Sequence, residues 1–181
     1  MRIQDVMSTP AVLCGRNDSL NDAARLMWEH DCGVIPVVKE DGRIAGIVTD
    51  RDICMAAYTK GKPLGSIPVA EAMAPRVFSC RVDDTLESVA QVMSDNQVHR
   101  LPVLDPEDRP VGLASFTDLV RYASTMAHGD GVERDILRGL AAVSRPRTEQ
   151  SRPSFDLPAP RLAAAPSPAT SRERRQARGS R

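Results

Sequence analysis

The sequence of 181 residues is short of aromatic side chains, cysteines and long apolar runs. Only four cysteines occur and no C-x-x-C pair joins any two of them, which argues against zinc-knuckle and thioredoxin-type sites. No stretch approaches the ~18 consecutive apolar residues of a membrane-spanning helix, and the start lacks the apolar core of a secretory signal. We therefore expect a cytoplasmic protein without a membrane partner, whose thiols are reduced.

Catalytic signatures are also missing. The three histidines, at positions 30, 99 and 128, are scattered, and no H-E-x-x-H, G-x-S-x-G or Walker motif occurs. We interpret His30 as a polar residue at a helix end. Cys14 and Cys80 hold equivalent places in the repeat described below, and we favour two small buried side chains over a symmetric disulfide or metal pair. The sequence thus predicts a protein that is not an enzyme, with no metal site and no cofactor.

Charge is distributed unevenly although the chain sums to zero. From Pro146 onward, eight arginines stand against three acidic residues, a net charge of +5, and six of the fourteen prolines lie there. Such a segment cannot bury enough apolar surface to fold, so residues 145–181 are expected to be a disordered basic tail. A basic arm could contact nucleic acid, but a solvated tail is the preferred interpretation, and nucleic acid is not the expected partner.

What the sequence does contain is an internal repeat. "GIVTDRDI" at 46–53 returns as "GLASFTDL" at 112–119, an offset of 66 residues that holds without a gap over about fifty residues. The identical pairs include Met7/Met73, Cys14/Cys80, Gly46/Gly112 and Asp52/Asp118. Self-similarity at a fixed period indicates a repeated supersecondary unit. Because there are only two copies, we expect them to pack face to face about a pseudo-twofold axis.

Each copy predicts the order strand, helix, strand, strand, helix. Asp18 or Ser19, and in the second copy Asp84 or Thr85, would cap a helix with apolar residues at i, i+3, i+4 and i+7. Two strands joined by a turn follow, and then a second helix. Pro36 and Pro102 fall inside the strands, which favours edge positions or strand starts. The expected divisions are repeat one at 1–59, a linker at 60–70, repeat two at 71–127, an amphipathic helix at 131–144 and the tail at 145–181.

This order, the "PVV…GIVTxxD" ending and the tandem arrangement resemble the CBS domain, the cystathionine β-synthase repeat. The pair is similar to small stand-alone bacterial CBS-pair proteins (Bateman modules), including those of the hypoxic-response type, and the resemblance covers roughly residues 1–125. It implies an α/β (α+β) fold of two β-α-β-β-α repeats, to which the predicted C-terminal helix and tail are added.

The repeated motif ends a strand and starts a helix. Exposed N–H groups and the positive end of the dipole make the first turn of a helix a suitable anion site. A hydroxyl can donate to a phosphate there, and a carboxylate can accept from ribose hydroxyls. The resemblance implies that Thr49 and Asp52 serve one adenine-nucleotide cleft and that Ser115 and Asp118 serve the other. The same four residues would also be ordinary helix caps, worth ~1 kcal/mol each, without any ligand.

The two copies differ in their cations. Copy two has "VHRLPV", and the resemblance implies that His99 and Arg100 contact phosphates. Copy one has "CGVIPV", with Gly33 and Val34 in those places, and Arg51 could substitute from the helix turn. The expectation is one good site, in the second cleft, and one degenerate site.

Three hypotheses remain open. The leading one is a non-catalytic regulatory module that binds an adenine nucleotide such as AMP, ADP or ATP as a regulatory ligand and signals energy or stress state to a partner protein. The second is a ligand-independent dimeric interaction scaffold, and the third is a nucleic-acid-associated protein acting through its arginine-rich tail. In all three we expect a homodimer assembled through the helices. The sequence leaves the choice of nucleotide and partner open.

Overall fold

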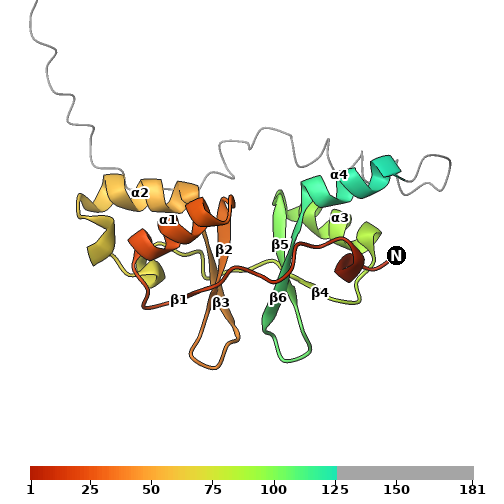
Figure 1. Cartoon of the computed structure of the whole chain (residues 1–181), viewed down its shortest axis with the longest axis horizontal. Coiled ribbons are helices and arrows are strands. Elements are labelled where there is room, and N and C mark those ends of the chain that lie inside the picture. The colour runs from red at the N-terminus through yellow and green to blue at the C-terminus, as the bar shows by residue number, and fades with distance from the viewer. Residues whose placement is uncertain (126–181) are drawn as a thin grey trace, which may run out of the picture.

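A computed structural model describes residues 1–125, which form two copies of one β-α-β-β-α unit side by side (Figure 1). The predicted fold class is confirmed. The predicted helix at 131–144 and the tail at 145–181 lie outside the described residues. The first copy consists of β1 (Cys14–Gly15), α1 (Leu20–Glu29), β2 (Val34–Val38), β3 (Ile44–Thr49) and α2 (Asp50–Lys60). The second consists of β4 (Cys80–Arg81), α3 (Leu86–Asn96), β5 (Arg100–Leu104), β6 (Pro110–Ser115) and α4 (Phe116–Thr125).

Short 3-10 turns precede each copy: η1 (Ile3–Asp5) before the first, and η2 (Leu64–Ser66) and η3 (Val69–Glu71) before the second. Ser19 and Thr85, one of each predicted pair, are the caps of α1 and α3, and each hydroxyl accepts a hydrogen bond from the backbone N–H three residues on. Each cap therefore satisfies one of the unpaired donors at its helix start. Within residues 1–125, none of the helices has both the length and the apolar character needed to cross a bilayer.

Each copy builds a three-stranded sheet in which the second strand is central. β1 runs parallel to β2, and β2 pairs antiparallel with β3; β4, β5 and β6 repeat this order. The expectation that Pro36 and Pro102 lie at sheet edges or strand starts is wrong, because both lie within central strands. The physical reason is the shortness of β1, which pairs only with Val37 and Val38. Pro36 precedes that stretch, so its missing N–H does not interrupt the parallel ladder.

The segment that leads into each repeat packs on the other repeat. Ile3 is fully buried in the core of the second copy, and its N–H donates to the carbonyl of Asp84 (2.9 Å). Val69, the equivalent residue 66 positions later, is fully buried in the core of the first copy. Figure 1 shows the N-terminal segment starting beside α3 and crossing to β1. The two repeats thus exchange their leading segments.

The glycines of the repeated motif make this exchange possible. Ser8 exchanges backbone hydrogen bonds of 2.9 Å with Leu113, and Ala74 does the same with Ile47 at 2.8 and 3.1 Å. The crossing backbone therefore comes so close that a Cβ on Gly112 would lie 2.9 Å from the carbonyl oxygen of Ser8. Gly46 has the same relation to Ala74, also at 2.9 Å. Both glycines are needed for close approach of the backbone.

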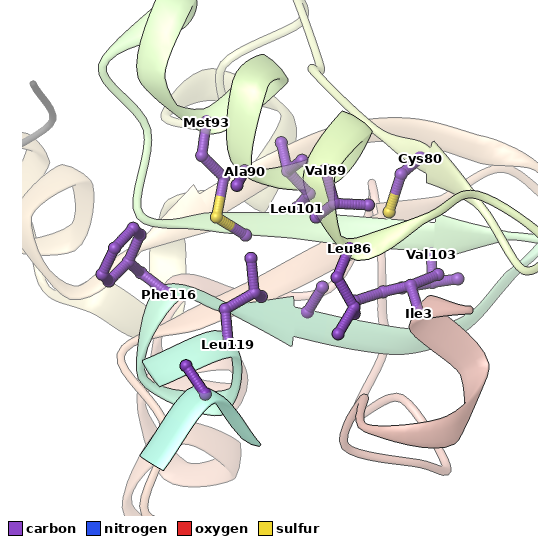
Figure 2. Packing of buried hydrophobic residues seen from close by; sticks show 12 residues of the cluster. Ile3, Cys80, Leu86, Val89, Ala90, Met93, Leu101, Val103, Phe116 and Leu119 are labelled. Carbon is purple, nitrogen blue, oxygen red and sulfur yellow. The ribbon is translucent and has the colours of Figure 1, made fainter. Parts of the chain in front are cut away.

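Each repeat has its own apolar core, between its sheet and its helices. Figure 2 shows the second core, where Ile3 packs beside Leu86 and Val103. Cys80 lies in this core, whereas Cys14 lies in the core of the first repeat, and both are free thiols. The interpretation of these cysteines as small buried side chains is confirmed. Burial, with a smaller contribution from a nearby aspartate, raises the pKa of each thiol to about 12.

Candidate functional site

A cavity of about 570 Å³ opens where the two repeats meet. Its walls come from four segments that are distant in the sequence: the crossing N-terminal segment, the end of α1 with the start of β2, the start of β5, and the end of β6 with the start of α4. The polar side chains among its lining residues are Ser8, Thr9, His30, Asp31, Arg100, Ser115, Thr117, Asp118 and Arg121. Three of the seven predicted site residues, Arg100, Ser115 and Asp118, are thereby brought into one cavity.

Asp118 is the one buried charged residue among those described, with 7% of its surface exposed. The hydroxyl of Ser115 donates to Asp118 Oδ2 (2.6 Å), and the backbone N–H of Ser115 donates to the same oxygen (3.0 Å). In return the N–H of Asp118 donates to Ser115 Oγ (3.1 Å). These reciprocal bonds form a capping box at the start of α4. They hold the carboxylate in one orientation at the cavity wall.

Thr49 and Asp52 make the same box at the start of α2. The Thr49 hydroxyl donates to Asp52 Oδ2 (2.7 Å), and the N–H of Asp52 donates to Thr49 Oγ1 (3.2 Å). The capping interpretation of the four motif residues is therefore realised in both repeats. Capping alone accounts for the pairing of hydroxyl and carboxylate, so it cannot by itself identify a ligand site. Whether a box belongs to a ligand site depends on the side chains around it.

Those surroundings differ in charge. Arg121 Nη1 lies 3.4 Å from Asp118 Oδ1, and both side chains line the cavity. Arg100 lines it too, from the start of β5. The equivalent residues of the first repeat are Met55 and Val34, which carry no charge. Asp52 is less buried than Asp118 and lines a separate hollow of about 340 Å³ with Lys60 and Glu71, which pair with each other (2.7 Å). Both arginines therefore lie at the cavity that contains the capping box of the second repeat.

The remaining predicted residues lie outside this cavity's lining. His99 is exposed, and its backbone carbonyl accepts from the N–H of Phe116 (2.8 Å) at the start of α4. Arg51 is exposed on the first turn of α2, where its backbone N–H donates to Asp50 Oδ1 (2.7 Å). Thr49 caps α2 on the other repeat. The assignment of these residues to nucleotide binding stays a prediction.

Several lining residues were missed by sequence reasoning. Arg121 follows Asp118 by one helical turn, and comparison with Met55 at the equivalent place could have pointed to it. His30, Asp31 and Cys32 reach the cavity from the other repeat, whereas the sequence predicts His30 only as a polar residue at a helix end. Nothing in their local sequence signals this, because their approach depends on how the two repeats pack. Within residues 1–125, no group of three or more His, Cys, Asp or Glu side chains is arranged to hold a metal.

Comparison with known proteins identifies the family of this pair of repeats. The family model "CBS domain" matches the chain twice, at residues 3–58 and 69–125. The chain belongs to the CBS domain family. No catalytic domain is present in the part of the chain that the structure describes, and CBS pairs are generally regulatory modules rather than catalytic ones.

The relatives of this CBS pair include small proteins that it matches over most of their length. The CBS domain-containing protein YhcV of Bacillus subtilis is 36% identical over 117 residues, which are 65% of this chain and 81% of YhcV. Hypoxic response protein 1 of Mycobacterium tuberculosis is 29% identical over 119 residues, 66% of this chain and 82% of that protein. These similarities confirm the resemblance to small CBS-pair proteins that the sequence indicates.

Solved structures share the fold. The crystal structure of Hypoxic Response Protein I with two coordinated zinc ions superposes with a TM-score of 0.62 at 29% identity, covering 67% of this chain and 98% of that one. The CBS domain pair of protein MJ0100, crystallised with 5'-methylthioadenosine and S-adenosyl-L-methionine, superposes with a TM-score of 0.63 at 28% identity, covering 69% of this chain and 97% of that one. The ligands in the second structure each contain an adenosine group.

Proposed function

We propose that this CBS pair is a non-catalytic regulatory module that binds an adenine nucleotide in the cavity between its repeats. The observation that carries the proposal is the convergence of Asp118, Arg100 and Arg121 on one cavity of about 570 Å³. A buried carboxylate beside two guanidinium groups suits a ligand that offers both sugar hydroxyls and phosphate oxygens. The adenosine-containing ligands of the MJ0100 CBS pair support this ligand class.

The ion pair between Asp118 and Arg121 at the cavity wall would open when the nucleotide binds. Asp118 Oδ2 is committed to the capping box, whereas Oδ1 faces Arg121 at 3.4 Å. Ribose hydroxyls would donate to Oδ1, and the guanidinium of Arg121, on a side chain that is 70% exposed, would turn to the phosphate. Arg100 would bind the phosphate from β5, another element of the same repeat. Both arginines favour di- and triphosphates over adenosine, because forked donors bind phosphate oxygens well.

The regulatory output of the module would pass to a protein partner that senses whether the cavity is filled, and the nucleotide would report energy or stress state. We also propose a homodimer assembled through the helices. Trp28 on α1 is 89% exposed and Tyr58 on α2 is 56% exposed, which leaves large aromatic surface uncovered on the first repeat. Sedimentation at tens of micromolar protein should show a dimer, and a monomer at that concentration would contradict this assembly.

Calorimetric titration with AMP, ADP, ATP, NAD and S-adenosylmethionine tests the binding proposal. A ligand at 100 times its dissociation constant stabilises the folded state by ~2.7 kcal/mol, which also raises the melting temperature by several degrees. Arg100→Val and Arg121→Met put into the second repeat the residues that the first repeat carries. Each should weaken phosphate-bearing ligands by roughly tenfold or more, since a charge-assisted hydrogen bond contributes ~1.5–3 kcal/mol, and should change adenosine little.

The reciprocal variant Met55→Arg is the matched control, because it adds the same charge one turn after Asp52, away from the cavity. It should leave nucleotide affinity unchanged. Heat too small to detect for every adenine nucleotide at millimolar concentration would remove the nucleotide proposal, and the dimeric scaffold would then be the better description. If Met55→Arg strengthened nucleotide binding by as much as Arg121→Met weakens it, overall charge, rather than the cavity, would govern binding.

A further inference from the structure

A second hollow, of about 530 Å³, lies on the first repeat between the end of α1 and the start of α2. Helical spacing places one face of each helix toward it: positions 24, 27, 28 and 31 from α1 and the turn that follows, and positions 50, 53 and 54 from α2. Two of the four cysteines of the chain line this hollow together, Cys32 and Cys54. Both are free thiols.

The second repeat fills the same place with apolar side chains. Phe116 occupies the position of Asp50 and is buried in the core of that repeat. Val98 occupies the position of Cys32, and both Val98 and Val120, the counterpart of Cys54, pack against that core. The hollow of the first repeat therefore exists where a carboxylate replaces a phenyl ring, and two thiols replace two valines. This difference exposes the pair of thiols to solvent from one side.

The two thiols differ in their surroundings. Cys54 is exposed one helical turn into α2 of the single chain, so an oxidant in solution reaches it directly while this face is free of the proposed dimer partner. Cys32 is half-buried, and burial raises the pKa of its thiol, partly opposed by a backbone hydrogen bond from Val34 and by the charge of Arg100. Cys54 is thus suited to react first, and Cys32 to be the thiol that attacks second.

Cys32 also belongs to the wall between this hollow and the nucleotide cavity. Asp31, Cys32 and Arg100 line both spaces. A covalent change at Cys32 would therefore act on the side of the cavity where Arg100 stands. The other two cysteines, Cys14 and Cys80, are buried in separate cores and have no such access.

We propose that Cys32 and Cys54 form a peroxide-sensitive thiol pair, closing to an intramolecular disulfide in the wall of the nucleotide cavity. The Cys54 thiolate attacks hydrogen peroxide, which gives a Cys54 sulfenic acid and hydroxide. The Cys32 sulfur then attacks the sulfenic sulfur, forming the S–S bond as hydroxide leaves and is neutralised by the thiol proton, so that water is released. Peroxide is reduced by two electrons, and the two thiols are oxidised to one disulfide.

Closure of the bond draws Cys32 toward α2 and shifts the neighbouring Arg100. This second part of the inference rests on the proposed nucleotide site. Oxidised protein should bind ATP about five- to tenfold more weakly than reduced protein, because Arg100 loses its place beside the phosphate. Nucleotide bound to the reduced protein should in turn slow disulfide formation, since coupling between two sites is reciprocal.

The test uses the full-length protein, treated with a small excess of hydrogen peroxide and then analysed by intact mass and peptide mapping. We expect a mass decrease of two hydrogens per chain and a peptide cross-linked between Cys32 and Cys54. Cys14 and Cys80 should remain alkylatable once the protein is unfolded. Cys32→Val and Cys54→Val introduce the residues that the second repeat carries, so they should fold and should not form the bond. Titration of ATP before and after oxidation, and after re-reduction, then measures the coupling.

Each remaining outcome counts against a defined part of the inference. Oxygen adducts on Cys54 without a cross-link, or a Cys54–Cys54 disulfide between two chains, would overturn the thiol pair. A complete intramolecular disulfide with unchanged ATP affinity would overturn the coupling. If the reduced protein binds no nucleotide, the proposed function fails on its own, while the mass measurement still decides the thiol pair.

Discussion

The sulfur of Met7 occupies the space that a side chain on Gly112 would need, 2.5 Å from the position of the absent Cβ. Met73 has the same relation to Gly46, at 2.7 Å. In each pair the methionine belongs to a leading segment and the glycine to the strand of the other repeat on which that segment lies. The glycine of the repeated motif is thus explained by the crossing segments, independently of any ligand.

Gly112→Ala should therefore destabilise the protein by about 1–3 kcal/mol, as overpacking does at other tightly packed sites. Urea unfolding of the variant measures the loss. Adding Met7→Ala should recover only part of it, because the backbone oxygen of Ser8 is also within 2.9 Å of the new Cβ. Full recovery in the double variant would show that only the flexible methionine, and not the crossing backbone, requires glycine.

Ile3→Ala should weaken the second repeat, although Ile3 precedes the first repeat in the sequence. Deleting a buried isoleucine side chain to the β-carbon costs ~2–5 kcal/mol. Hydrogen exchange should show the loss of protection first in β5 and α3, whose residues surround Ile3. The matched variant, Val69→Ala, should affect β2 and α1 first. Loss of protection in the same elements for both variants would contradict the exchanged packing.

Asp118→Ala and Asp52→Ala separate capping from ligand binding. The two boxes have nearly equal hydrogen bonds, with hydroxyl-to-carboxylate distances of 2.6 and 2.7 Å, so each variant should cost the unliganded protein a similar ~1 kcal/mol. Only Asp118→Ala should abolish the rise in melting temperature caused by nucleotide, because only Asp118 lines the cavity with Arg100. Equal loss of the nucleotide effect in both variants would mean that the first repeat also binds.

The buried thiols predict a dependence of stability on alkaline pH. The pKa of Cys14 and of Cys80 is raised from 9.0 to about 12 in the folded protein. Above about pH 9 the unfolded chain therefore ionises these thiols while the folded chain keeps the protons, so stability is intact below pH 9 and falls as the pH rises toward 12. The slope is up to about 1.4 kcal/mol per pH unit for each thiol.

Urea midpoints at pH 7 and pH 10.5 measure this effect. The double variant Cys14→Val and Cys80→Val should lose less stability than the wild type over this interval, because it has nothing to ionise at the two positions. Other groups also titrate in this range, and the variant carries them unchanged, so the difference between the two proteins isolates the thiols. Parallel curves for variant and wild type would contradict the assignment.

Much of this architecture could be predicted from sequence because the repeat is gapless. The sequence predicted the order of elements, a pair of candidate caps in each copy that includes Ser19 and Thr85, and the grouping of Ser115 with Asp118, all of which depend on local chain chemistry. The place of Pro36 within a central strand could not be predicted, because a proline is tolerated there only since β1 is too short to pair with it. Nor could the approach of His30 and Asp31 to the second repeat's cavity, which results from packing between repeats.

Because the leading segments are exchanged, the stretch of sequence that is duplicated differs from the set of residues that forms one core. On the ribosome, the first core would wait for Ile67 and Val69, which are synthesised only after all its helices and strands. The second core needs Ile3, made at the very beginning. Cutting the gene between the copies would therefore give two fragments that each carry the other's missing piece. Mixed together, such fragments should complement one another, whereas a fragment alone lacks the segment that packs on its core and could fill that place only with its own leading segment or that of a second copy.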